Sequence, residues 1–185
     1  MDKKIVLFLL ICMLGACIPI KVAPSISDYR IQMGKRFKKG LPQRQVFLFE
    51  DSKSEGEFYA YVNTKFQLGH DRVYDDVPFV LNGRQYFMAI YETSKTNKAL
   101  NFLPTLLDAG FQAALGNEPE EVTEPSEHTS EQYYIAIEVY SDFEKDCLAG
   151  DALSRQSVLE YLRNLKAEYL ATHNYNEILF KDKGL

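Results

Sequence analysis

The sequence predicts an α+β protein with one mainly antiparallel sheet and helices packed on one face of it. Three observations support this fold class. Apolar residues alternate over 132–140, as in a half-buried strand. They recur at helical spacing over 152–172, as in an amphipathic helix. An Asn82-Gly83 pair lies between two apolar runs, which predicts a tight hairpin and therefore antiparallel strands.

A strand, a helix and a hairpin are the first elements predicted in the folded part. Residues 46–49 are an apolar run typical of a buried strand. Residues 52–55 match a capping box, and apolar residues then recur at helical spacing, so a helix should run to Thr64 or Phe66. The hairpin joins 77–81 to 84–92, and the second arm is apolar on both faces, which indicates an interior strand.

The second half of the chain is less uniform. Residues 97–116 suit two short helical pieces interrupted by Pro104, and a strand over 99–103 is the alternative. Residues 117–131 carry six glutamates and two prolines, which predicts a solvated acidic loop. The strand at 132–140 follows, and Asp151 and Ser154 are candidate caps of the last helix. The apolar stripe of that helix consists of Val158, Leu162, Leu165 and Tyr169.

Composition limits the class of protein. The chain has 185 residues, of which 46% are hydrophobic and 13% aromatic. That is enough apolar material for one packed domain, and it excludes disorder throughout. Three cysteines in a chain of this length exclude a disulfide scaffold.

The first seventeen residues carry the most specific pattern in the sequence. Lys3 and Lys4 precede an apolar run over 5–14, which has about half the length that a membrane-spanning helix needs. The run therefore predicts a cleaved signal peptide. Its end, Leu14-Gly15-Ala16-Cys17, resembles the lipobox of bacterial lipoproteins. The resemblance implies cleavage before Cys17, lipidation of its thiol and acylation of the new amino terminus, and several acyl chains anchor a protein stably.

The same resemblance carries expectations about location. Ile18, a non-acidic residue after the cysteine, implies the outer membrane. No acidic run of the kind that marks surface export in Bacteroidota follows, so the protein is expected to face the periplasm. Residues 17–29, 46–66 and 133–180 also resemble small uncharacterised lipoproteins of Bacteroidota. That resemblance implies location and a single domain, and it brings no catalytic residues.

Charge divides the expected mature chain. Residues 21–45 hold seven Lys/Arg and one acid, a net of +6, whereas 46–185 hold twelve Lys/Arg and 24 acids, a net of −12. We therefore expect a signal peptide over 1–16, a lipidated, flexible basic tether over 17–45, and a single α+β domain over 46–185. The densest basic cluster, 35–39, suits either attraction to phosphate groups or a solvated tether.

Catalytic and metal-binding patterns are weak. Acids at 142, 144 and 146 would raise the pKa of Cys147, which predicts a small buried residue rather than a nucleophile. With Cys12 removed and Cys17 acylated, Cys147 has no partner for a disulfide. The nearest approach to a metal cluster is His70, Asp71, Asp75 and Asp76. These four lack the spacing of a calcium loop, so a solvated turn is favoured and no metal or cofactor is predicted.

These observations favour a lipid-anchored cell-envelope protein that acts as an interaction or structural module. Its expected partners are the membrane, through lipidated Cys17, and an envelope protein that the sequence does not identify. The alternative is a small-ligand or lipid carrier tethered to the outer membrane. An enzyme ranks third because no hydrolase, zinc or phosphate-loop motif is present. The acidic domain and the lipid anchor argue against nucleic acid as a partner.

Overall fold

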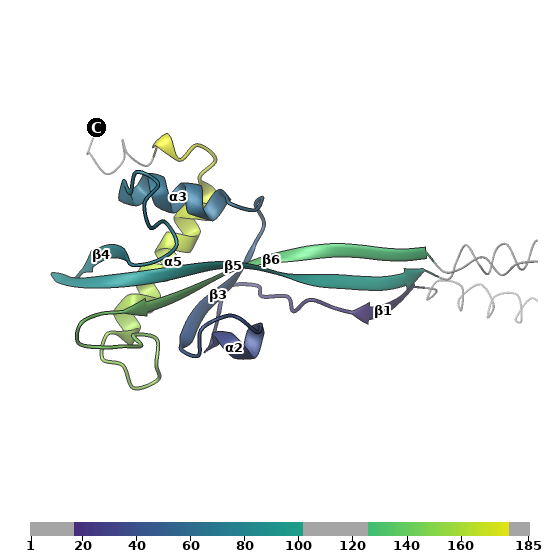
Figure 1. Cartoon of the computed structure of the whole chain (residues 1–185), viewed down its shortest axis with the longest axis horizontal. Helices are drawn as coiled ribbons and strands as arrows, with labels where there is room; N and C mark the ends of the chain where they lie inside the picture. The colour runs from purple at the N-terminus through teal and green to yellow at the C-terminus, as the bar shows by residue number, and fades with distance from the viewer. Residues whose placement is uncertain (1–16, 102–125, 178–185) are drawn as a thin grey trace, which may run out of the picture. The chain divides into compact units, whose positions relative to one another are not determined.

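A computed structural model describes residues 17–101 and 126–177 (Figure 1). The chain divides into two compact units, one comprising Ser25–Ser94 with Tyr133–Leu185 and the other Met1–Pro24 with Lys95–Gln132. We call these the larger and the smaller unit. The predicted boundary at residue 45 does not coincide with the boundary between them. The described elements are β1 (Cys17–Lys21), β2 (Arg30–Met33), α2 (Gly34–Phe37), β3 (Gln45–Asp51), α3 (Glu57–Phe66), β4 (Val77–Leu81), β5 (Arg84–Asn101), β6 (Ser126–Tyr140) and α5 (Arg155–Ala171).

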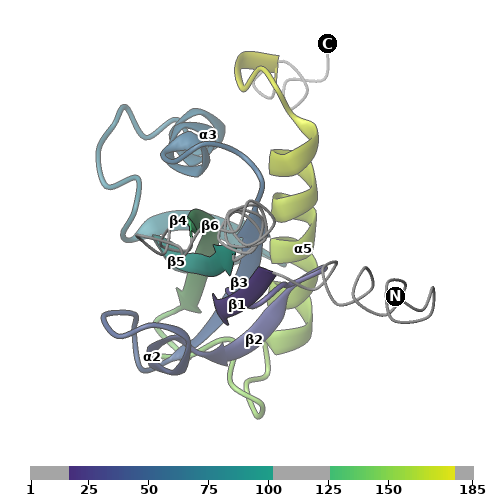
Figure 2. The same cartoon turned by 90° about the vertical axis from the view of Figure 1, so that its right-hand side faces the viewer.

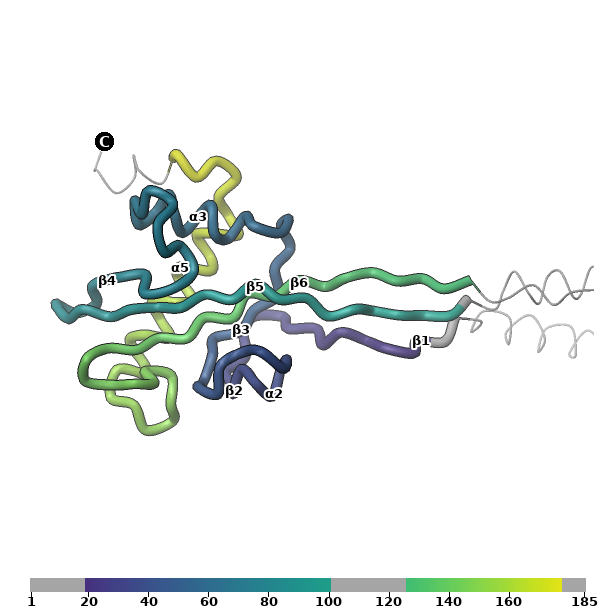
Figure 3. Tube along the Cα trace, in the orientation of Figure 1, coloured from purple at the N-terminus to yellow at the C-terminus, as the bar shows by residue number. Residues whose placement is uncertain are grey.

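The strands form one open sheet, and the predicted α+β class is confirmed. Its order is β1-β5-β6-β3-β2, with β4 also paired to β5. The pairs β1–β5, β2–β3, β3–β6 and β4–β5 are antiparallel. Figure 3 shows β5 and β6 running side by side as the two long strands. No helix in the described part of the chain is long and apolar enough to cross a membrane.

One face of the sheet forms the core of the larger unit together with the two long helices. Phe47 lies opposite Ile137, and Phe49 lies opposite Ile135, so all four side chains share this face. The packing is aromatic: the rings of Phe58 on α3 and Tyr169 on α5 meet edge to face at 4.8 Å, and Phe49 contacts both rings. Figure 2 shows α3 and α5 beside the sheet. The predicted stripe of α5 is buried: Val158, Leu162, Leu165 and Tyr169.

The predicted hairpin and interior strand are confirmed. Asn82 and Gly83 have φ angles of 51° and 74°, as a tight turn between antiparallel strands requires. Met88 on one face of β5 and Ala89 on the other are both buried, at 0% and 2% exposure.

Two expectations about the second half of the chain need correction. Residues 97–101 continue β5, so the strand alternative is right there and the helix is wrong, while 102–116 lie outside the described residues. Residues 126–131, expected in a loop, are the exposed start of β6, and 117–125 lie outside the described residues. Composition indicated solvation correctly. Composition could not indicate the strand, because the strand depends on the neighbouring β5, whose backbone pairs with this segment.

The prediction of a flexible tether over 17–45 was wrong. Residues 17–21 pair with β5 in the smaller unit, and 30–33 pair with β3 in the larger one. Ile26 and Phe37 are 7% and 6% exposed, and the Phe37 ring packs edge-on against Tyr134 at 4.9 Å. Tyr134 lies on the face of β6 opposite Ile135, so α2 packs on the other side of the sheet from α3 and α5. A few apolar residues among the cations were enough to dock this segment.

The capping box predicted for α3 is wrong, whereas Ser154 takes the predicted N-cap position of α5 but makes no side-chain cap. α3 begins after Gly56, whose φ is 84°, and the box at 52–55 makes no side-chain cap. Glu92 on β5 replaces it, because its Oε2 accepts the Gly56 amide at 2.9 Å. Ser154 is the residue before α5, but its hydroxyl donates to the Glu144 carboxylate and caps nothing itself.

Candidate functional site

The four residues considered for metal binding do not converge. His70 is held by Asn63, whose Oδ1 accepts the His70 amide at 2.7 Å. Asp75 Oδ1 accepts the amide of Asp76, and Asp76 Oδ1 accepts the hydroxyl of Tyr140. Among the residues that the structure describes, no three His, Cys, Asp or Glu side chains are grouped so that they could hold a metal ion.

The predicted burial of Cys147 is confirmed. Its exposure is 0%, its thiol points to the backbone carbonyl of Glu144 at 3.6 Å, and burial raises its pKa. A buried thiol with a raised pKa carries little thiolate, which is the reactive form. Cys17, the predicted lipidation site, is the first residue of β1.

A surface groove of about 370 Å³ in the larger unit is the candidate site. Three segments line it: the β4–β5 turn with the start of β5, the loop between β6 and α5, and the first turn of α5. A hydrogen bond of 3.3 Å from Asn82 Nδ2 to Ser157 Oγ joins the turn to the helix. The lining residues are Asn82, Arg84, Gln85, Tyr86, Ser141, Phe143, Glu144, Leu153, Ser154 and Ser157.

Two large apolar side chains in this lining lie almost entirely in solvent. Phe143 is 86% exposed and Leu153 is 95% exposed. Local hydrogen bonds fix the backbone at both positions. Ser141 Oγ accepts the amides of Phe143 and Glu144 at 3.3 and 3.1 Å, and Glu144 Oε1 accepts the Leu153 amide at 2.6 Å. The loop therefore presents both side chains on an ordered backbone.

The Glu144 carboxylate joins two parts of the groove lining by hydrogen bonds. Its Oε2 accepts the Ser154 amide at 3.2 Å and also the Ser154 hydroxyl, while its Oε1 accepts the Leu153 amide. The Ser154 hydroxyl is the main reason why the pKa of Glu144 is lowered, and the Arg84 charge adds to the effect. Within the described residues the Arg84 guanidinium makes no hydrogen bond or ion pair. The groove thus combines two apolar side chains with an exposed cation.

We expect Glu144→Gln to lower the free energy of unfolding by about 1 kcal/mol at neutral pH, because one amide oxygen replaces two charged acceptors at the start of α5. The folded state lowers the pKa of Glu144, so this contribution is present above the usual carboxyl range and is lost as the pH falls through the folded-state pKa. The difference between wild type and variant should therefore shrink in acid. Urea titrations followed by circular dichroism measure it, and a difference independent of pH would contradict the assignment.

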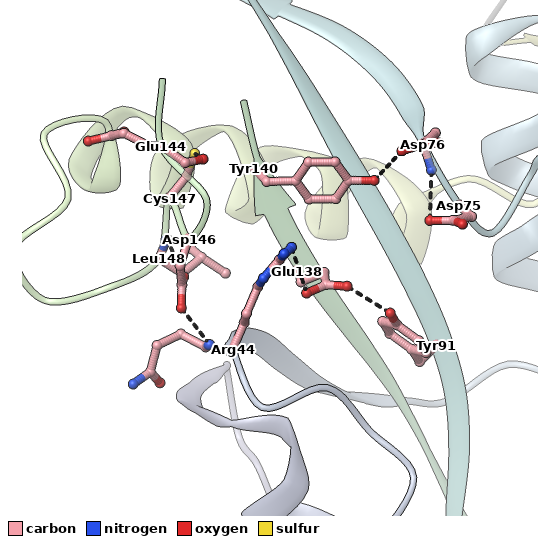
Figure 4. Close-up of polar contacts among 11 residues, drawn as sticks. Arg44, Asp75, Asp76, Tyr91, Glu138, Tyr140, Glu144, Asp146, Cys147 and Leu148 are labelled. Atoms are coloured by element: carbon pink, nitrogen blue, oxygen red, sulfur yellow. Dashed lines mark hydrogen bonds and ion pairs between the residues drawn. The ribbon is translucent and has the colours of Figure 1, made fainter. Parts of the chain in front are cut away.

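A second polar network lies on the sheet face opposite the aromatic core (Figure 4). Tyr91 donates to Glu138 Oε1 at 2.7 Å, and Arg44 reaches Glu138 Oε2 at 3.6 Å. The guanidinium of Arg44 also lies 5.5 Å from the centre of the Tyr140 ring, whose hydroxyl donates to Asp76. Burial, reinforced by these carboxylates, raises the pKa of both tyrosines. Their hydroxyls stay protonated, so the network serves as fixed hydrogen bonding rather than as a base.

Sequence reasoning missed the groove. Its residues come from three segments, and the weak signals were Phe143 and Leu153, apolar residues within otherwise polar stretches. No protein-family model matches this chain, and neither a curated protein nor a solved structure is significantly similar to it.

Proposed function

We propose that this chain is a lipid-anchored protein of the cell envelope and that its larger unit is an interaction module. The observation that carries the proposal is the pair of apolar side chains held in solvent on an ordered backbone beside the groove. Covering a side chain of this size contributes about 1.5–3 kcal/mol, so Phe143 and Leu153 together provide a usable anchor for a partner.

The chemistry of the groove describes the partner segment. Arg84 offers a guanidinium that forms two parallel hydrogen bonds with a carboxylate when one approaches. Glu144 lies close enough for its charge to interact with Arg84, but its oxygens accept three hydrogen bonds from Leu153 and Ser154 and make none with the guanidinium. We therefore expect an envelope protein that presents an apolar side chain next to an Asp, a Glu or a carboxyl terminus.

The location part of the proposal depends on the first seventeen residues. Leu14-Gly15-Ala16-Cys17 supports lipidation at Cys17, with the acyl chains inserted in the outer membrane and the protein facing the periplasm. An anchored interaction module needs little intrinsic affinity, because confinement to the membrane raises the local concentration of a partner confined to the same envelope.

The lipid-carrier alternative has weaker support. A carrier of acyl chains needs an enclosed apolar cavity, whereas the groove is open and is lined by serines, amides and charged groups as well as by two apolar side chains.

Affinity purification from membranes of the native host, after mild crosslinking, tests the interaction. We expect one envelope protein to copurify with the wild-type chain and at least tenfold less of it with Phe143→Ser/Leu153→Ser, since two anchors are lost. Tyr74→Ser/Val80→Ser is the matched control, because Tyr74 and Val80 are 61% and 64% exposed and lie outside the lining of the groove. Equal recovery with all three chains would refute the groove as the binding site.

A further inference from the structure

The densest cluster of positive charge in the sequence is presented by an ordered part of the larger unit. Residues 34–44, which we call the basic α2 loop, comprise α2 and the turn that returns the chain to β3. Lys35, Arg36 and Lys39 are exposed, and within the described residues none of their side chains makes a hydrogen bond or an ion pair. Lys38 is also exposed and donates to the Ser94 carbonyl at 2.9 Å.

Backbone contacts hold this loop in one conformation. The amides of Gly34 and Lys35 donate to the carbonyls of Arg44 and Pro42 at 3.1 and 2.9 Å, so the two ends of the loop are joined. Gly34 is required at that point, because a Cβ there would lie 2.8 Å from the Pro42 carbonyl oxygen. Phe37 attaches the loop to the sheet, because its side chain is only 6% exposed and packs against the ring of Tyr134. On either side of Phe37 the cations Lys35, Arg36 and Lys39 are exposed.

The charge of the rest of the chain makes this loop distinctive. Residues 21–45 carry a net charge of +6, whereas 46–185 carry −12. An anionic surface therefore attracts the basic α2 loop and repels most of the remaining protein. The three cations lie within five consecutive residues and are all exposed, which suits a diffuse layer of negative charge better than a single carboxylate.

We propose that the basic α2 loop binds the anionic headgroups of a lipid bilayer. This inference deepens the proposed function. Ser25, where the larger unit begins, is eight positions after Cys17, and an extended chain of eight steps spans at most about 29 Å. A lipid on Cys17 would thus keep the larger unit close to the membrane, and contact through the loop would orient it there. The lipid would thus hold the protein at the membrane, and the loop would set the orientation of the larger unit on it.

Vesicle cosedimentation tests the proposal without the lipid anchor. The probe is the mature chain from residue 17 carrying Cys17→Ser, with vesicles of phosphatidylcholine alone or mixed with phosphatidylglycerol. We expect binding that requires phosphatidylglycerol and weakens as salt is added. Removing one charge near such a surface weakens binding roughly fivefold, so Lys35→Gln/Arg36→Gln/Lys39→Gln should bind about a hundredfold more weakly.

The matched control removes the same charge from elsewhere in the larger unit. Arg72→Gln/Lys145→Gln/Arg163→Gln alters three exposed cations outside the loop and should bind like the parent chain. Equal weakening by both triple variants, or binding independent of phosphatidylglycerol, would overturn the proposal. Release by inorganic phosphate, but not by sodium chloride of the same ionic strength, would also overturn it and would assign the loop to free phosphate. None of these residues lines the groove, so failure here leaves the proposed partner site standing.

Discussion

Cys17→Ser is expected to abolish stable membrane association and to release the protein into the soluble fraction of the envelope. The expectation follows from the proposed lipid anchor. One acyl chain gives only marginal and reversible binding, whereas two or more hold a protein firmly, and all of them depend on the modified cysteine. The basic α2 loop alone should give only weak attachment that salt reverses. Salt-washed membrane fractions and the intact mass of the chain measure the outcome.

Cys12→Ser is the control for this experiment. It also removes a thiol, but from the part of the chain that should be cleaved, so it should leave attachment unchanged. The wild-type chain should have the mass of residues 17–185 plus a lipid modification. If Cys17→Ser stays on salt-washed membranes as firmly as Cys12→Ser does, or if the wild-type chain carries no lipid mass, the anchor assignment is wrong.

Lys53→Met is expected to lower the free energy of unfolding by about 3 kcal/mol at neutral pH, the largest single effect on stability that we predict outside the aromatic core. The Lys53 ammonium donates to the carbonyls of Tyr169 and Thr172 at 2.6 and 2.5 Å, which closes the carboxyl end of α5. It also lies 4.4 Å from the centre of the Tyr169 ring. Removing it takes one of two hydrogen bonds from the Tyr169 carbonyl, which keeps the Thr172 amide at 3.3 Å, and takes the Lys53 hydrogen bond from the Thr172 carbonyl. It also removes the positive charge that offsets the negative end of the helix dipole.

Asp51 gives this prediction a pH dependence. Its carboxylate is 5% exposed and accepts the Tyr169 hydroxyl at 3.1 and 3.0 Å, and burial raises its pKa despite the opposing charge of Lys53. A carboxyl group whose pKa is raised on folding costs stability at neutral pH, and the cost is relieved as the pH falls through the folded-state pKa. Without Lys53 the pKa of Asp51 rises further. The penalty of Lys53→Met should therefore be largest at neutral pH and smaller in acid.

Urea unfolding followed by tyrosine fluorescence measures these stabilities, since the sequence has twelve tyrosines and no tryptophan. Lys145→Met is the matched control, because Lys145 is exposed in the loop between β6 and α5, and it should change stability by less than about 0.5 kcal/mol. A similar loss for the two variants, or a Lys53→Met penalty that grows in acid, would contradict the role given to Lys53.

Local patterns predicted the parts of the fold that depend on local chemistry. Each correct prediction came from a pattern within a short segment. These patterns are the alternation over 132–140, the Asn82-Gly83 turn and the apolar stripe that includes Leu162. The segment 17–45 was wrongly predicted to be a flexible tether, because the prediction relied on its net charge and gave too little weight to two apolar residues, Ile26 and Phe37. Their docking depends on a sheet whose other strands come later in the chain.

The candidate site could not be predicted for a related reason. Glu144 binds Leu153 and Ser154 across a loop, and Arg84 reaches the same groove from a segment about sixty residues earlier. The cap of α3 is similar, since Glu92 lies 36 residues after the amide of Gly56 that it accepts. Contacts at such separations leave no periodic trace in a single sequence, and exposure of one Phe or Leu is unremarkable until its surroundings are known.

Site-specific photocrosslinking in living cells tests the central claim most directly. A photoreactive residue at position 153 should form one major adduct with an envelope protein, and the same residue at position 74 should not. Arg84→Ala in the chain labelled at position 153 should weaken that adduct, because the partner's carboxylate then loses its counter-charge. No adduct at position 153, or the same adduct from both positions, would contradict the account of this protein as an anchored interaction module that binds through the groove.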